Sequence, residues 1–339
     1  MFSADMKIKK RAALISLVIG FLMFFGKTGA YFLTGSAAVL SDALESVVHI
    51  IATSFAFYSL IVSSKPPDPE HPYGHGKISF FSAGFEGAMI IIAAISILYY
   101  AIHDIIFGRE ISSLDTGAFI ITGASVVNLL LGWYLIRIGK KTKSIILIAD
   151  GKHVLTDSIT SFGAVAALIL VLLTDITLFD PVVAIILALN ILWTGKDLVR
   201  ESIGGLINEQ DKNTIKDIAA AVDAERKSNP AWIDLHRLRY WKSGDRLMVD
   251  FHLTVPYYSS VDESHNLAIN IENLLKENLD TPELELLVHL DPCKVNFCKI
   301  CRHTACGVRS GPQLFDVIWD SAKVVENYSY IADELPEKD

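Results

Sequence analysis

The sequence predicts an α-helical membrane protein in which six transmembrane helices precede a small α+β domain. Of its 339 residues, 51% are hydrophobic, and such a composition indicates membrane spans. The apolar residues gather in six long runs. After about residue 206 the sequence becomes polar and mixed, as in a globular domain.

The apolar runs cover residues 12–33, 36–63, 79–106, 115–138, 144–174 and 178–199. Each approaches or exceeds the roughly 20 residues that cross about 30 Å of hydrocarbon. The first run is too long for a signal peptide and lacks a small-residue cleavage site, so it is interpreted as a span.

Positive charges flank the runs almost entirely on one side, with Arg109 as the exception on the other. They are Lys7, Lys9, Lys10 and Arg11 before the first run, Lys65 and Lys77 between the second and third, and Arg137, Lys140, Lys141 and Lys143 between the fourth and fifth. We therefore expect both termini in the cytoplasm and a location in the plasma or inner membrane. The net charge of −8 says little about partners, because most of the acidic excess lies in the polar part. No nucleic-acid partner is expected.

The polar part predicts the element order αββαβ. Periodicity favours helices over 212–227 and 261–278, and strands over 233–242, 246–255 and 284–290. We divide the chain into a transport domain (1–205), a metal-binding and dimerisation domain (206–293) and a cysteine-rich tail (294–339) with a short helix near 313–331.

Two apolar runs contain ionisable residues four positions apart. Glu45 and His49 lie in the second run, and His153 and Asp157 lie in the fifth. This spacing places each pair on one helix face. Placing an ionisable group inside a membrane costs free energy. Such groups are therefore first interpreted as functional residues. Together the pairs can supply four ligands to one metal ion.

The depth of the two pairs is compatible with a single site. Glu45 and His49 lie roughly 14–20 Å into their span at helical rise, and the other pair lies equally deep from the opposite side. A polar cluster that joins helices without metal is the alternative. Asp42 and Asp150, one turn before each pair, are not assigned as ligands. Lys27 and Glu86 are interpreted as lone charges that snorkel or pair within the bundle.

Several motifs resemble those of the cation diffusion facilitator family of divalent-metal efflux transporters. They are TGSAAVLSDALESVVH in the second run, HPYGHGK after it, ADGKHVLTDS in the fifth run and HLDPC at the end of the domain. The resemblance implies a ferredoxin-like cytoplasmic domain and a homodimer. It also implies exchange of metal for protons by alternating access, with the substrate at the two helix pairs.

The second run departs from the family pattern. The position of Glu45 more often carries Asp or His, and that of His49 usually carries Asp. Two imidazoles and two carboxylates suit tetrahedral zinc, whereas manganese transporters of the family tend to use carboxylates without His. We expect zinc, and iron(II), cobalt(II) and nickel(II) remain open. Because His binds metal only when neutral, protons compete for the site.

Two further sets of residues are candidate metal sites. The loop after the second run offers Asp68, His71 and His75, unless HPYGHGK serves only its turn geometry. The polar domain offers His236, His252, His265, His289 and Asp291. The resemblance implies that equivalent positions bind metal near the dimer interface. The match is incomplete, because Ile269 stands where some members carry a carboxylate.

All four cysteines follow in one short segment: Cys293, Cys298, Cys301 and Cys306. Disulfides are rare in the cytoplasm, so the cluster favours a thiolate site for structural zinc or another thiophilic ion. Free redox-active thiols and an iron–sulfur cluster are the alternatives.

The predicted function is export of divalent metal cations in exchange for protons, and not an enzymatic reaction. The chain lacks H-E-x-x-H and places no base beside an open zinc position. A membrane-anchored metal sensor without efficient transport is the alternative from another functional class.

Overall fold

The structure is a computed structural model that describes residues 2–34, 37–107, 116–174, 176, 178–244, 246–279 and 283–327. It divides into two compact units, Met1–Ile207 and Asn208–Asp339. The described part of the cysteine-rich tail, up to residue 327, groups with the second unit.

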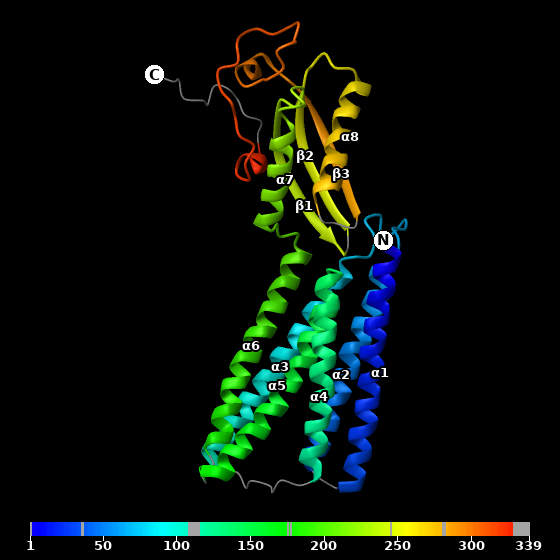
Figure 1. Cartoon of the computed structure of the whole chain (residues 1–339), viewed down its shortest axis with the longest axis vertical. Coiled ribbons are helices and arrows are strands. Elements are labelled where there is room, and N and C mark those ends of the chain that lie inside the picture. Colours follow the sequence, from blue (N-terminus) through cyan, green and yellow to red (C-terminus); the bar gives the residue numbers. More distant parts are fainter. Residues whose placement is uncertain are drawn as a thin grey trace. The chain divides into compact units, whose positions relative to one another are not determined.

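Within the described residues, the first unit contains six long helices, as predicted (Figure 1). They are α1 (Phe2–Thr34), α2 (Ala37–Ser63), α3 (Ile78–Phe107), α4 (Thr116–Lys141), α5 (Ile145–Thr174) and α6 (Phe179–Leu206). Among the described residues, Asp5–Gly29, Ile78–Phe107 and Pro181–Leu206 are each long and apolar enough to cross a membrane. Large apolar side chains such as Phe25, Ile92 and Trp133 are more than half exposed, which suits a surface facing lipid.

The helices pack around two hydrophobic cores. The first joins α1, α2, α4 and α5, with Ala13, Leu60, Leu135 and Val154 among its members. The second joins α3 and α6 to α5 and is centred on residues such as Ile90. Helix α5 therefore contributes to both cores.

Two glycines bring α3 and α6 into close contact. A Cβ atom on Gly87 would lie 3.0 Å from the carbonyl oxygen of Gly195, and a Cβ atom on Gly195 would lie 3.0 Å from that of Gly87. Small residues allow such close helix packing in membranes. The two helices therefore form a tightly packed pair.

The second unit has the predicted order αββαβ. Its elements are α7 (Lys212–Glu225), β1 (Asp234–Ser243), β2 (Arg246–Val255), α8 (Val261–Asn278) and β3 (Glu283–Pro292). Strand β2 lies in the centre, antiparallel to β1 and parallel to β3. Asp211 caps α7 by accepting a hydrogen bond from the Thr214 amide, and Ser260 and Glu263 form a capping box at the start of α8.

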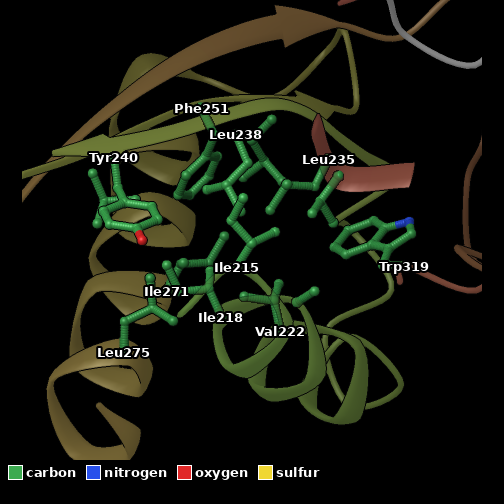
Figure 2. Packing of buried hydrophobic residues seen from close by; sticks show 14 of the residues in the cluster. Ile215, Ile218, Val222, Leu235, Leu238, Tyr240, Phe251, Ile271, Leu275 and Trp319 are labelled. Atoms are coloured by element: carbon green, nitrogen blue, oxygen red, sulfur yellow. The ribbon is translucent and has the colours of Figure 1, made fainter. Parts of the chain in front are cut away.

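One face of the sheet packs against both helices (Figure 2). Leu235, Leu238 and Phe251 of the strands meet Ile218 of α7 and Ile271 of α8. Residues that alternate with these strand residues point to the other face. The β-bulge after His236 keeps Leu238 in the core, because it inserts one extra residue opposite β2.

The predicted helix near 313–331 is wrong for the part that the structure describes, which ends at residue 327. The described tail contains only two 3₁₀ turns, Val295–Lys299 and Lys323–Val325. The tertiary contacts of Trp319 explain the difference: its side chain is 1% exposed in the core, and its amide donates to Asp223 Oδ1. Burial of this large ring outweighs a weak local helix preference.

Candidate metal sites

The first candidate site lies in the membrane unit, where α2 and α5 meet. His49 and His153 are 5% and 6% exposed, and their ring centroids are 5.6 Å apart. Asp157 Oδ2 lies 3.9 Å from His153 Nε2. Three of the four predicted ligands therefore lie near one another, although among the described residues their ligand atoms do not all come within 4.8 Å of one another. Glu45 belongs to the same helix as His49, but its side chain, like that of Asp42, lies outside the described residues.

A residue that was interpreted from the sequence as a lone charge, and not as part of the site, lies beside this group. Glu86 of α3 is 1% exposed, and its Oε2 atom lies 3.6 Å from His153 Nδ1. The signal was present in the sequence, because a carboxylate in an apolar run indicates function. With no second ionisable residue at helical spacing in the same run, its partner could not be identified.

Asp150 serves a different contact. It is 1% exposed and accepts a hydrogen bond of 3.2 Å from the Thr53 hydroxyl, which links α5 to α2. This contact agrees with its exclusion from the predicted ligands.

The loop between α2 and α3 forms the second candidate site. Asp68 Oδ1 lies 3.1 Å from His71 Nδ1, and Asp68 Oδ2 lies 3.3 Å from His75 Nε2. One ligand atom from each residue can be chosen so that all lie within 4.8 Å of one another. Although desolvation opposes it, hydrogen bonds from the backbone and ring of His71 lower the pKa of Asp68. The loop thus holds an ionised carboxylate beside two imidazoles.

The third candidate site lies on the sheet face away from α7 and α8. His236, His252 and His289 are paired across β1, β2 and β3 in one row. Asp291 Oδ2 lies 3.0 Å from His252 Nδ1 and 3.7 Å from His236 Nε2. These three residues also have ligand atoms within 4.8 Å of one another. His289 Nε2 lies 3.5 Å from Asp291 Oδ1.

Two residues outside the predicted set support His236. Asp234 is fully buried, and its Oδ2 atom lies 3.2 Å from His236 Nδ1. Lys323 of the tail reaches Asp234 Oδ1 with its Nζ atom at 3.1 Å. Burial alone would raise the pKa of Asp234, but the hydrogen bond with His236 and the charge of Lys323 lower it. Because side chains alternate along a strand, the sequence predicts that Asp234 and His236 share one face. The contact with Lys323 depends on the tertiary structure.

His265 does not join this group within one chain. It is exposed on α8, the helix that covers the opposite face of the sheet. The structure thus assembles four of the five residues predicted for the C-terminal unit and places His265 apart from them.

The cysteines surround one small cavity. Cys293, Cys298, Cys301, Cys306 and His303 all line a space of about 20 Å³. The amide of His303 donates to Cys301 Sγ, and the hydroxyl of Ser310 donates to Cys298 Sγ. However, among the described residues only the loop and sheet groups have three ligand atoms within 4.8 Å of one another. The geometry therefore does not support a preassembled zinc site at the cysteines.

Comparison with known proteins agrees with this architecture. The model of the cation efflux transmembrane domain matches residues 13–207, and that of the cytoplasmic domain of cation efflux proteins matches residues 209–293. The second match ends at Cys293, where the cysteine-rich segment begins.

Relatives from several organisms share both parts. An uncharacterised transporter of Synechocystis is 35% identical over 78% of this chain and 84% of its own length. The manganese efflux system protein MneP of Bacillus subtilis is 25% identical over 86% and 99%. The zinc transporter ZitB of Yersinia pestis is 27% identical over 75% and 80%. These matches show that the chain belongs to the cation diffusion facilitator family of membrane transporters that export divalent metal cations and are not enzymes.

Proposed function

We propose that this chain exports zinc from the cytoplasm in exchange for protons, by alternating access at a site formed by Glu45, His49, His153 and Asp157. The observation that carries the proposal is the meeting of His49 and His153, buried between α2 and α5, with Asp157 beside them. Buried ionisable residues that converge from two spans are typical of an ion pathway.

The ligand chemistry favours zinc over manganese. Imidazole nitrogen suits zinc, iron, copper and nickel, whereas manganese prefers sites made of oxygen atoms. The relatives do not decide the metal, because their names include both zinc and manganese. Iron(II), cobalt(II) and nickel(II) exporters of the same mechanism are the alternatives. Protons enter the mechanism because an imidazole releases metal when it binds a proton.

The loop and sheet groups are proposed as additional metal sites on the cytoplasmic side. Their support is the convergence of His71 and His75 on Asp68, and of His236 and His252 on Asp291. We further propose a homodimer, since the cytoplasmic-domain match covers residues 209–293. In a homodimer, the exposed His265 of one copy is available to bind metal at the sheet face of the other.

The cysteine-rich segment is proposed as a thiophilic metal site that assembles on binding. All four cysteines line one cavity. Although desolvation opposes it, the hydrogen bond from the Ser310 hydroxyl helps to lower the pKa of Cys298 and so favours its thiolate. Replacing all four cysteines with serine should lower the zinc bound per purified chain, as measured by mass spectrometry. Unchanged stoichiometry would refute this site.

A flux assay tests the transport proposal. Proteoliposomes with an imposed pH gradient should accumulate zinc, and Asp157→Ala should lower the initial rate by at least about tenfold. Asp197→Asn is the matched control, because Asp197 is an exposed carboxylate of α6 in the same unit. Competition with iron(II), cobalt(II), nickel(II) and manganese(II) gives the selectivity order. Zinc binding without zinc flux would favour a membrane-anchored sensor.

A further inference from the structure

We propose that Glu86 is a positioning residue of the transport site, whose carboxylate accepts the Nδ1–H of His153 and thereby reserves Nε2 for the metal. The proposal rests on the proposed transport function of His153. Glu86 comes from α3, which contributes none of the predicted ligands.

The ring of His153 lies between two carboxylates. Its Nδ1 atom is 3.6 Å from Glu86 Oε2, and its Nε2 atom is 3.9 Å from Asp157 Oδ2. The two nitrogens therefore have different partners. Asp157, a proposed metal ligand, lies nearest Nε2, and Glu86 lies nearest Nδ1.

This arrangement selects one tautomer of the imidazole. A neutral imidazole has one N–H donor and one nitrogen lone pair. If Glu86 accepts the proton of Nδ1, the lone pair of Nε2 is left for the metal. Carboxylates hold metal-binding histidines in this way in many sites. The gap of 3.6 Å exceeds a hydrogen bond, and a shift of about 0.5 Å closes it.

The burial of Glu86 supports a specific role. The side chain is 1% exposed, and neither carboxylate oxygen accepts a hydrogen bond from the residues that the structure describes. Burying a carboxylate costs free energy unless a partner compensates for its lost hydration. His153 Nδ1 is the partner that the structure places beside it.

The position of α3 gives the contact a further consequence. Gly87, the next residue, packs against Gly195 of α6, so Glu86 is fixed to the tightly packed α3–α6 pair. His49 and His153 belong to α2 and α5, which share a core with α1 and α4. The Glu86–His153 contact therefore connects the α3–α6 pair to the helices that bind the metal.

Three variants of Glu86 test the role in zinc flux and zinc affinity. Glu86→Gln keeps an oxygen that can accept the Nδ1–H, so its KM for zinc should stay within about threefold of the natural protein. Glu86→Leu removes the acceptor and should raise KM by about 10- to 100-fold. Glu86→Asp withdraws the carboxylate by about 1.5 Å, one C–C bond, and should be intermediate. Ser96→Ala is the control on α3, because Ser96 is exposed and bonds only within its helix.

Cobalt(II) spectroscopy separates positioning from direct ligation. Subtracting the visible spectrum of cobalt-loaded His153→Ala isolates the transport site from other bound cobalt. With Glu86→Leu the band shape should be retained while the affinity falls, because the ligands are the same. A changed band shape would make Glu86 a ligand and overturn the proposal.

The outcomes distinguish this proposal from the proposed function. If Asp157→Ala transports normally, the transport site itself is wrong. If Asp157→Ala is inactive but all Glu86 variants match the natural protein, only the role of Glu86 is wrong. A Glu86→Gln protein as impaired as Glu86→Leu also overturns hydrogen-bond positioning, since the acceptor alone would then not suffice. Should Glu86→Leu fail to fold, the Gln and Asp variants still decide.

Discussion

In the membrane unit, His153 lies between Glu86 and Asp157, at 3.6 and 3.9 Å from its two nitrogens. In the C-terminal unit, His236 lies in the same way between Asp234 and Asp291, at 3.2 and 3.7 Å. In both units, a buried carboxylate supports one side of the imidazole and a candidate ligand lies on the other.

The scaffolds of these two sites differ. Asp234 and His236 are neighbours on one strand, and Lys323 supplies a cation to Asp234. Glu86 and His153 are on different helices, α3 and α5, which share a core with α6. Their contact therefore depends on how two helices pack, whereas the strand holds Asp234 and His236 at fixed spacing.

The largest expected effect separates the two sites by function. His153→Ala should lower the rate of zinc flux by at least about tenfold, because it removes a proposed transport ligand. His252→Ala removes a proposed ligand of the sheet site and should leave flux within about threefold while reducing bound zinc. Proteoliposome flux and metal analysis of the same preparations measure both. Equal loss of flux in the two variants would contradict the division of roles.

The next effect concerns the tail that supports the sheet site. Trp319→Ala removes a ring that is 1% exposed in the core and should destabilise the C-terminal unit by about 3–5 kcal/mol. Hydrogen exchange of the full chain in detergent should show faster exchange in α7 and β1, with α2 and α5 unchanged. Leu314→Ala is the matched control, because Leu314 is 56% exposed in the same tail. Exchange that is equally slow in both variants would show that the tail does not stabilise the unit.

A third prediction concerns the charge pair behind His236. Lys323→Met leaves Asp234 buried without its cation and should cost about 3–5 kcal/mol at neutral pH. Because folding lowers the pKa of Asp234, its contribution is present above the unfolded pKa and is lost as the pH falls through the lower folded pKa. The stability difference between the two proteins should therefore shrink in acid. Urea unfolding at several pH values, monitored by hydrogen exchange, measures the difference in unfolding free energy between the two proteins. If this difference did not change with pH, the result would contradict the pairing of Lys323 with Asp234.

The smallest expected effect is at a helix end away from both sites. Asp211→Ala removes the N-cap of α7, in which the Asp211 carboxylate accepts a hydrogen bond of 3.0 Å from the Thr214 amide. It should cost about 1 kcal/mol of stability and leave zinc flux unchanged. Asp211→Asn keeps an acceptor and should recover most of that loss. A large effect on flux would indicate that α7 couples to transport.

The sequence by itself determined the elements whose signals are local. Six apolar runs predicted the six long helices that the structure describes, helical periodicity predicted α7 and α8, and strand signals predicted β1, β2 and β3. The i,i+4 spacing of His153 and Asp157, and the matching depth of His49, predicted the meeting of α2 and α5 that the structure contains. These features depend on periodicity and length, which are properties of the sequence alone.

Only the tertiary structure decided which distant residues complete each site. Glu86 meets His153 because α3 packs against α5, and Lys323 meets Asp234 because Trp319 anchors the tail in the core. In the described tail, irregular chain with two 3₁₀ turns stands in place of the expected helix, and His265 lies on the helix that covers the face opposite the histidine row. No local pattern encodes such contacts, since they depend on the free energy of burying side chains from segments far apart in sequence.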